Sequence, residues 1–149
     1  MNPFLITEAK KERYTLKGYW GLPTLIEVFE KNAALYPEKE ILVDSATRLT
    51  FSEAKRCVDR LALGLLDLGF KKDDVLVVQL PNIVESALLR LAAPKAGILV
   101  LSILSAFNAS EVKHILGNSE ARGVVVPWKV GETDYVQKVG GIRYDLPHL

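Results

Sequence analysis

Two patterns of apolar residues alternate along this chain: stripes with the period of a helix, and short continuous runs. The clearest helical stripe runs from 51 to 68, where Thr50 and Glu53 form a capping box and Gly69 supplies a C-terminal stop. Between the helical stripes lie short, nearly continuous apolar runs, which are typical of strands buried on both faces. Helices are predicted over 24–36, 51–68, 82–97, 108–116 and from 134 to the glycines at 140–141. Buried strands are predicted over 75–80, 98–104 and 121–126.

The order of these elements predicts the fold class. Strand, helix, strand, helix, strand is the pattern of parallel βαβ units, whose crossover helices cover the faces of a sheet. Two further short strands, 41–43 and 48–51, flank a turn at 44–47 and predict a small hairpin before the parallel part. We therefore expect an α/β fold with a mostly parallel sheet and an N-terminal β-hairpin.

The two ends of the chain carry weaker patterns. Residues 1–23 show no sustained period, and we expect an irregular N-terminal arm followed by one α/β unit over 24–149. Asn82 with Glu85 is read as the cap of the 82–97 helix. Trp20 and Trp128 fall in predicted loops, where we expect them to cover edges of the core. The last residues end without a closing element, so the chain is expected to be truncated.

Composition and charge narrow the function. The 149 residues are 49% hydrophobic and 25% charged, and 19 Lys or Arg nearly balance 18 Asp or Glu. Because no stretch gathers five or six like charges, no nucleic-acid partner is expected. The single Cys57 excludes an internal disulfide, and the N-terminus lacks an export signal, so we expect a cytoplasmic protein. The longest apolar run, 96–107, is shorter than the roughly 20 residues of a membrane span.

The residues offer no self-sufficient catalytic centre. No GxGxxG follows a predicted strand, and the run from Gly64 to Lys71 resembles a Walker loop only in spacing. His114 is expected on a helix surface, Cys57 as a buried thiol, and Asp73–Asp74 in a solvated turn. His148 also lacks a cluster of partners. We therefore expect no catalytic, cofactor-binding or metal-binding residue in this chain.

Seven segments in series resemble the N-terminal region of the AMP-forming acyl- and aryl-acid ligases, the superfamily of acyl-CoA synthetases and adenylation domains. No single segment is specific, but their order is. The similarity covers about residues 24–130. The segments are Tyr36-Pro37-Glu38, Leu49-Thr50-Phe51-Ser52-Glu53, Leu68-Gly69-Phe70-Lys71-Lys72-Asp73-Asp74-Val75, Leu80-Pro81-Asn82, Lys95-Ala96-Gly97, Ser110-Glu111-Val112 and Ser119-Glu120-Ala121.

The resemblance implies a two-step reaction for the whole enzyme. A carboxylate attacks the α-phosphate of ATP, giving an acyl-adenylate and pyrophosphate. A thiol, of coenzyme A or of a carrier-protein pantetheine, then takes the acyl group, and CoA is the expected acceptor. ATP, Mg²⁺ and CoA are implied for that enzyme. The family's phosphate loop, adenine segment, ribose-binding Asp and C-terminal Lys have no match here, so this chain is expected to be an inactive fragment that binds no cofactor. Two segments resemble members that activate aryl or similar compact acids, namely Gly18-Tyr19-Trp20 and Val78-Gln79-Leu80-Pro81-Asn82.

Two departures from the family pattern concern the backbone. Asp73 stands where the family usually has Gly, for which we expect a different turn conformation. The family's Pro after Gly97 is missing, so the loop before Asn108 is expected to follow another path.

Two alternatives remain open, one for function and one for assembly. The chain could be an independent α/β binding module of the flavodoxin or receiver kind, although its predicted strand ends lack the acidic cluster of a receiver. As part of a ligase, its partner is expected to be the remainder of the large domain. The apolar surface that such a partner would cover also favours self-association of the isolated chain.

Overall fold

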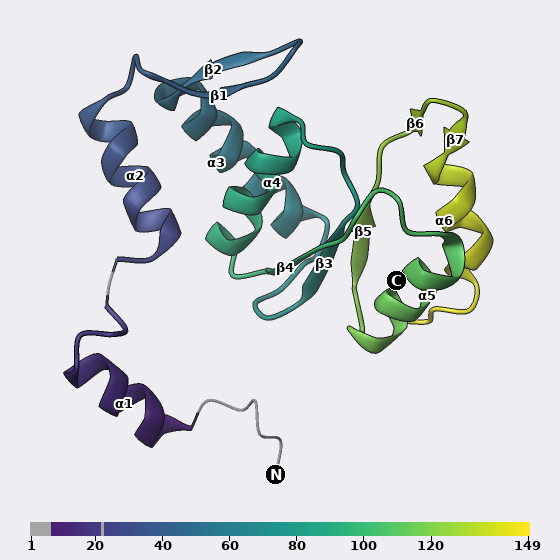
Figure 1. Cartoon of the computed structure of the whole chain (residues 1–149), viewed down its shortest axis with the longest axis horizontal. Helices are drawn as coiled ribbons and strands as arrows, with labels where there is room; N and C mark the ends of the chain where they lie inside the picture. The colour runs from purple at the N-terminus through teal and green to yellow at the C-terminus, as the bar shows by residue number, and fades with distance from the viewer. Residues whose placement is uncertain (1–6, 22) are drawn as a thin grey trace.

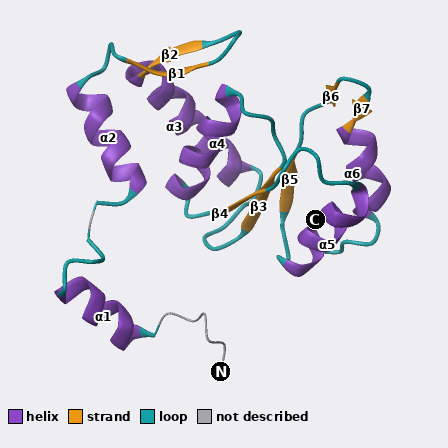
Figure 2. Ribbon diagram, in the orientation of Figure 1, coloured by secondary structure: helices purple, strands orange, loops and turns teal. Residues whose placement is uncertain are grey.

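The computed structural model describes residues 7–21 and 23–149, which form an α/β structure built on a three-stranded parallel sheet (Figure 1). The predicted fold class, with its parallel sheet and N-terminal hairpin, is confirmed (Figure 2). The helices are α1 (Glu8–Leu16), α2 (Leu25–Leu35), α3 (Phe51–Asp67), α4 (Val84–Lys95), α5 (Ala109–Asn118) and α6 (Tyr135–Arg143). The strands are β1 (Glu40–Val43), β2 (Arg48–Thr50), β3 (Val75–Val78), β4 (Leu99–Ser102), β5 (Gly123–Val125), β6 (Lys129–Val130) and β7 (Thr133–Asp134).

The central sheet has the order β4-β3-β5, with β3 parallel to both neighbours. Leu76 of β3 lies opposite Val100 on one side and Gly123 on the other. Helices α3 and α4 lie on one side of this sheet and α5 and α6 on the other (Figure 1). The chain leaves β3 for β4 and then crosses to β5, so the direction of winding changes between β3 and β5.

The side chains of β3 alternate between two apolar clusters, as expected for a strand covered on both faces. Leu76 and Val78 face α3 and α4. Val77 faces α5, where it packs with Val112 and Leu116. A third cluster joins α2, α3 and α4 and keeps the hairpin against them. It consists of Phe29, Ala54, Val58, Ala62, Val84, Leu88 and Ala92.

β4 differs from the prediction of a strand buried on both faces. Leu99 is 54% exposed and Leu101 37% exposed, although both are apolar. β4 is an edge strand of a narrow sheet, and α5 packs over β3 and β5 instead. One face of β4 is therefore left uncovered by the described residues.

The capping box predicted at Thr50 is confirmed, and the cap predicted for the 82–97 helix is wrong. Thr24, Thr50 and Asn108 each make the capping box with a glutamate three residues later. The predicted Asn82–Glu85 cap of α4 is wrong, because the N-cap is Ile83, which makes no side-chain cap bond. Asp44, in the hairpin turn, takes the place of Asn82. Its Oδ2 accepts the Val84 N–H at 2.9 Å.

The N-terminal arm is not irregular as expected, since α1 occupies Glu8–Leu16. The Thr7 hydroxyl accepts the Lys10 N–H at 3.3 Å, and Lys11 pairs with Glu8 at 2.7 Å. These local contacts suffice for a short helix without an apolar stripe, and none of its nine residues is buried. Trp20 packs on Tyr14 with ring centroids 5.7 Å apart, so it contacts the arm and not the core edge that was predicted.

The C-terminal part contains a two-residue strand pair and α6. Asp134 caps α6 at its predicted start, and its Oδ1 accepts the Gln137 N–H at 2.8 Å. The helix was expected to end before Gly140, but it continues through both glycines to Arg143. Trp128 is 75% exposed, which contradicts its predicted role as a core cover.

The turn before β3 keeps a glycine-like conformation. Asp73 has φ 69°, in the left-handed region, so the different turn expected for Asp in place of Gly is not adopted. Asp is one of the few residues that tolerate this region. The Asp73 N–H donates to the Gly97 carbonyl at 2.9 Å, and Asp74 Oδ2 accepts the Lys71 N–H at 2.7 Å, which fixes the turn.

Among residues 7–21 and 23–149, no helix combines the length and the apolar character that crossing a membrane requires.

Candidate functional site

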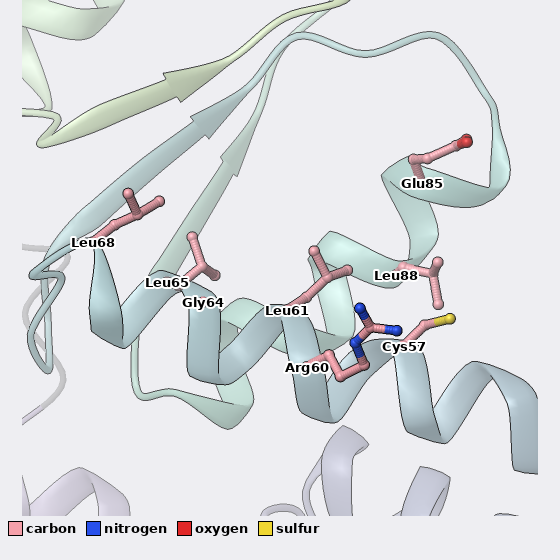
Figure 3. Close-up of a pocket in the computed structure, with 8 residues that line it drawn as sticks. All are labelled: Cys57, Arg60, Leu61, Gly64, Leu65, Leu68, Glu85 and Leu88. Atoms are coloured by element: carbon pink, nitrogen blue, oxygen red, sulfur yellow. The ribbon is translucent and has the colours of Figure 1, made fainter.

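A groove with a volume of about 670 Å³ lies between α3 and α4 (Figure 3). Leu61, Leu65 and Leu88 give it an apolar floor, and Leu68 closes the end next to the sheet. It is lined by Cys57, Arg60, Leu61, Gly64, Leu65, Leu68, Glu85 and Leu88. Because the amphipathic stripe of α3 is wider than the surface that α4 covers, part of the stripe remains open.

The polar groups of this groove are too few for acid–base or nucleophilic chemistry. Cys57 is half-buried, not fully buried as predicted, while Arg60 and Glu85 are exposed at the rim. A thiol with no histidine in the groove lacks the base that activates a nucleophile. The groove can therefore receive apolar surface from a partner, but its own residues supply no reaction centre.

A second candidate lies at the carboxyl end of the sheet, where open α/β folds commonly bind ligands. Gln79, which follows β3, is fully buried. Its Nε2 donates to the carbonyl oxygens of Leu104 at 3.0 Å, Phe107 at 3.3 Å and Ser105 at 3.5 Å. Its Oε1 has no hydrogen-bond partner among the described residues.

Helix α6 holds the same loop from the other side. The Tyr135 hydroxyl donates to the Ser105 carbonyl at 3.1 Å, and the Lys138 ammonium donates to the Phe107 carbonyl. The loop after β4 is thus bound by groups from two elements and occupies the crevice at this end of the sheet. The crevice presents backbone carbonyls in place of the acidic cluster that receiver chemistry needs.

Four charged side chains join α2, α3 and α4. Lys95 pairs with Glu30 and Asp59, and Lys55 pairs with the same two carboxylates at 3.0 and 2.7 Å. We refer to Glu30, Lys55, Asp59 and Lys95 as the charge cluster. Two cations and two anions balance within it, so it holds helices together and offers no unpaired group for catalysis.

The pKa values of the charge cluster move in the directions expected of ion pairs. The Lys95 hydrogen bond chiefly lowers the pKa of Glu30. Partial burial raises the pKa of Asp59, but hydrogen bonds from Lys55 and Lys95 outweigh it and the net change is downward. Hydrogen bonds to Asp59 and then to Glu30 raise the pKa of both lysines.

The other residues considered from sequence lie apart from one another. His114 is exposed on α5, with Nε2 2.9 Å from the Asn118 amide nitrogen. Asp74 lies 3.4 Å from the Arg122 guanidinium near the start of β3. Within residues 7–21 and 23–149, no three His, Cys, Asp or Glu side chains gather as a metal site would require.

Sequence reasoning missed Gln79 and most of the charge cluster. Lys55 and Asp59 were visible as an i, i+4 pair on one helix face, but Glu30 and Lys95 join them only through tertiary packing. Gln79 interrupts an apolar run, which is the one sequence signal that could have marked it as a buried polar group.

Comparisons of the sequence with a family model and with curated proteins point to the same family. A family model described as AMP-binding enzyme matches residues 29–146. Salicylyl-CoA synthase / salicylate adenylyltransferase of a Streptomyces species is 33% identical over 138 residues, 93% of this chain and 25% of that protein. The mitochondrial medium-chain acyl-CoA ligase ACSF2 of Rattus norvegicus is 35% identical over 106 residues, 70% of this chain and 17% of that protein.

The fold is shared with solved ligases. The structure of a putative long-chain-fatty-acid CoA ligase from Rhodopseudomonas palustris superposes with a TM-score of 0.76 at 30% identity, covering 85% of this chain and 31% of that one. The chain spans 17–25% of the length of the curated relatives that it matches.

Proposed function

This chain belongs to the AMP-binding enzyme family, and we propose that it forms the N-terminal part of the large domain of an ATP-dependent, AMP-forming carboxylic acid ligase. The observation that carries this proposal is the match of the family model to residues 29–146, together with relatives named as CoA synthases and ligases. We assign residues 24–149 to one subdomain of that large domain and residues 1–23 to a separate arm, which includes α1.

The role proposed for this part is structural. That this chain by itself binds no ATP, Mg²⁺ or CoA is part of the proposal, and the described residues support it. No cluster of metal ligands is formed by them, and the Lys95 and Lys138 ammonium groups are engaged by protein oxygens. The unpartnered atom at the crevice, Gln79 Oε1, is an acceptor, and a phosphate oxygen would be another acceptor. We therefore propose that the chain alone is catalytically inactive.

The proposed partner is the remainder of the ligase large domain. Burying the groove between α3 and α4 would remove apolar surface of Leu61, Leu65 and Leu68 from water, which is worth about 25 cal/mol per Å². A segment from the rest of the domain that docked into this groove would hold α3 and α4 in place as a rigid support for the active site of the ligase.

The match to salicylyl-CoA synthase supports an aryl acid as the substrate and CoA as the acceptor. The match to salicylyl-CoA synthase extends over 138 of 149 residues, so it includes at least residues 12–138 wherever it begins. Tyr14, Tyr19 and Trp20 fall within that match but before the start of the family model at 29.

A cytoplasmic location stays part of this proposal, supported by the single cysteine.

The test compares this chain with the protein encoded by the longest reading frame that contains it. Both are assayed for ATP–pyrophosphate exchange with salicylate, benzoate and octanoate. We expect exchange from the longer protein, with salicylate or benzoate preferred over octanoate, and none from the chain alone. Exchange by the isolated chain would overturn the structural role, and a longer protein without exchange for any carboxylic acid would overturn the ligase assignment.

A further inference from the structure

The edge of β4 that faces away from β3 pairs with no strand of the described residues, because β4 ends the order β4-β3-β5. The N–H groups of Leu99 and Ile103 donate to carbonyls of Asp74 and Val78 on the β3 side. Since N–H and C=O groups alternate in direction along a strand, those of Val100 and Ser102 point outward. This edge, Leu99–Ser102, can therefore accept another strand.

The side chains at this edge are uncharged, and all except Ser102 are apolar. Leu99, Leu101 and Leu104 are 54%, 37% and 66% exposed. No Lys, Arg, Asp, Glu or His occurs from residue 96 to residue 110. Folded proteins normally protect an exposed edge strand with charges, Pro or bulges, and β4 has none of these within it.

The edges of the hairpin and of β5 carry such protection. In the hairpin, Glu40 and Arg48 form a bidentate ion pair at 2.7 Å on its exposed side. At the far edge of the central sheet, β5 is half-buried throughout and follows Arg122, which is exposed. Of the edges described, that of β4 is the one suited to a neutral, apolar partner.

We propose that β4 binds β4 of a second copy of this chain in antiparallel orientation, joining the two three-stranded sheets into one of six strands. With only Val100 and Ser102 pointing outward, the register that uses both places a two-fold axis at Leu101. Each Val100 then pairs with Ser102 of the partner subunit, and four N–H···O bonds form. The edge is self-complementary because a strand without charge meets an identical strand without charge.

The same arrangement covers the exposed leucines. The two Leu101 side chains become direct cross-strand neighbours, and each Leu99 lies beside them on the same face. Directly opposed residues have Cβ atoms about 4.5–5.5 Å apart, close enough for apolar contact. The interface is small, so the dimer is expected to be weak and concentration-dependent.

The inference does not depend on the ligase assignment, because it concerns the 149-residue chain without nucleotide or acid. Its first test is sedimentation equilibrium of that chain from about 5 to about 500 µM. We expect a monomer–dimer equilibrium within this range. A strictly monomeric chain throughout the range would overturn the proposal, whatever the pyrophosphate exchange of the longer protein shows.

Ser102→Pro tests the edge directly. The outward Ser102 N–H is not used in pairing with β3, so proline removes no bond of the monomer but blocks the second strand. Each dimer loses two N–H···O bonds, which should raise the dimer Kd roughly tenfold or more. Ser102→Ala keeps the N–H and is the matched control, with an unchanged Kd. Circular dichroism verifies that both variants fold.

Disulfide trapping tests the register. In a Cys57→Ser background, Leu101→Cys should cross-link quickly under mild oxidation, because the Cα atoms of facing residues across a non-hydrogen-bonded pair are about 4.5 Å apart. Leu63→Cys is the control, because Leu63 on α3 is 62% exposed, more than Leu101, and yet it should cross-link slowly. Equal rates for the two cysteines, or a dimer insensitive to Ser102→Pro, would assign association to another surface and reject the β4 pairing.

Discussion

Removing the Lys95 ammonium should destabilise the chain more than removing any solvent-exposed ion-pair partner. Lys95 contacts Glu30 of α2 and Asp59 of α3 at once, and its side chain is 27% exposed. Lys95→Met keeps the aliphatic stem but leaves two carboxylates sharing the Lys55 cation. Exposed pairs contribute about 0–1 kcal/mol each, so losing two partly shielded contacts, discounted for solvent screening, should cost about 1–2 kcal/mol.

The measurement is urea unfolding followed by circular dichroism at neutral pH in moderate salt. Lys113→Met is the matched control, because Lys113 makes a single exposed pair with Asp145 at 2.7 Å. We expect the control to change the free energy of unfolding by no more than about 0.5 kcal/mol. In a double-mutant cycle, Lys95→Met and Glu30→Gln should couple by about 0.5–1 kcal/mol.

The stability that the charge cluster contributes should change with pH in a direction set by its pKa values. The pKa values of Glu30 and Asp59 are lowered from 4.5 and 3.8, so their contribution is present above those values and is lost as pH falls through the lowered ones. The pKa of Lys95 is raised from 10.5, so its contribution is complete below that value and is lost as pH rises through the raised one. The reasoning is refuted if Lys95→Met costs no more than Lys113→Met between about pH 5 and pH 10, or if the cycle is additive.

Substitutions at three further positions, with one second-site change, probe the backbone and the core. Asp73→Gly should stabilise the chain and Asp73→Ala should not, with a difference of about 1 kcal/mol, because φ at this position is 69°; thermal unfolding measures both. Val58→Ala should cost about 2 kcal/mol in urea unfolding, since Val58 is fully buried between α3 and α4, and a loss below about 0.5 kcal/mol would contradict the packing described. Gly123→Ala should destabilise by about 1 kcal/mol, because its Cβ would lie 2.7 Å from Phe70 Cζ, and Phe70→Leu should relieve that loss in the double variant.

Local signals in the sequence predicted much of the fold. Thr50 and Glu53 are three residues apart, and a contact of that range can be read from the chain alone. The α4 cap could not be read in this way, because Asp44 reaches Val84 across 40 residues of sequence. Its Oδ2 substitutes for Asn82, which sequence reasoning placed in that role.

The exposure of β4 had no local signal at all. Leu99 and Leu101 are as apolar as the residues of β3, and only the number of strands in the sheet decides which strand is covered on both faces. The absence of a catalytic residue was predicted from the missing motifs and stays a prediction. The groove between α3 and α4 was not predicted, because it depends on how far the two helix stripes overlap.

Because β3 lies between β4 and β5, its two strand pairings are expected to form in a definite order. Val75 meets Leu99 across 24 residues, whereas Leu76 meets Gly123 across 47, so the first pairing closes the smaller loop. During synthesis on a ribosome, β3, α4 and β4 emerge before β5. Until β5 is made, the edge of β3 at Val77 and Val78 that pairs with β5 has no partner strand. Amide hydrogens of β5 should therefore acquire protection last in pulsed exchange during refolding.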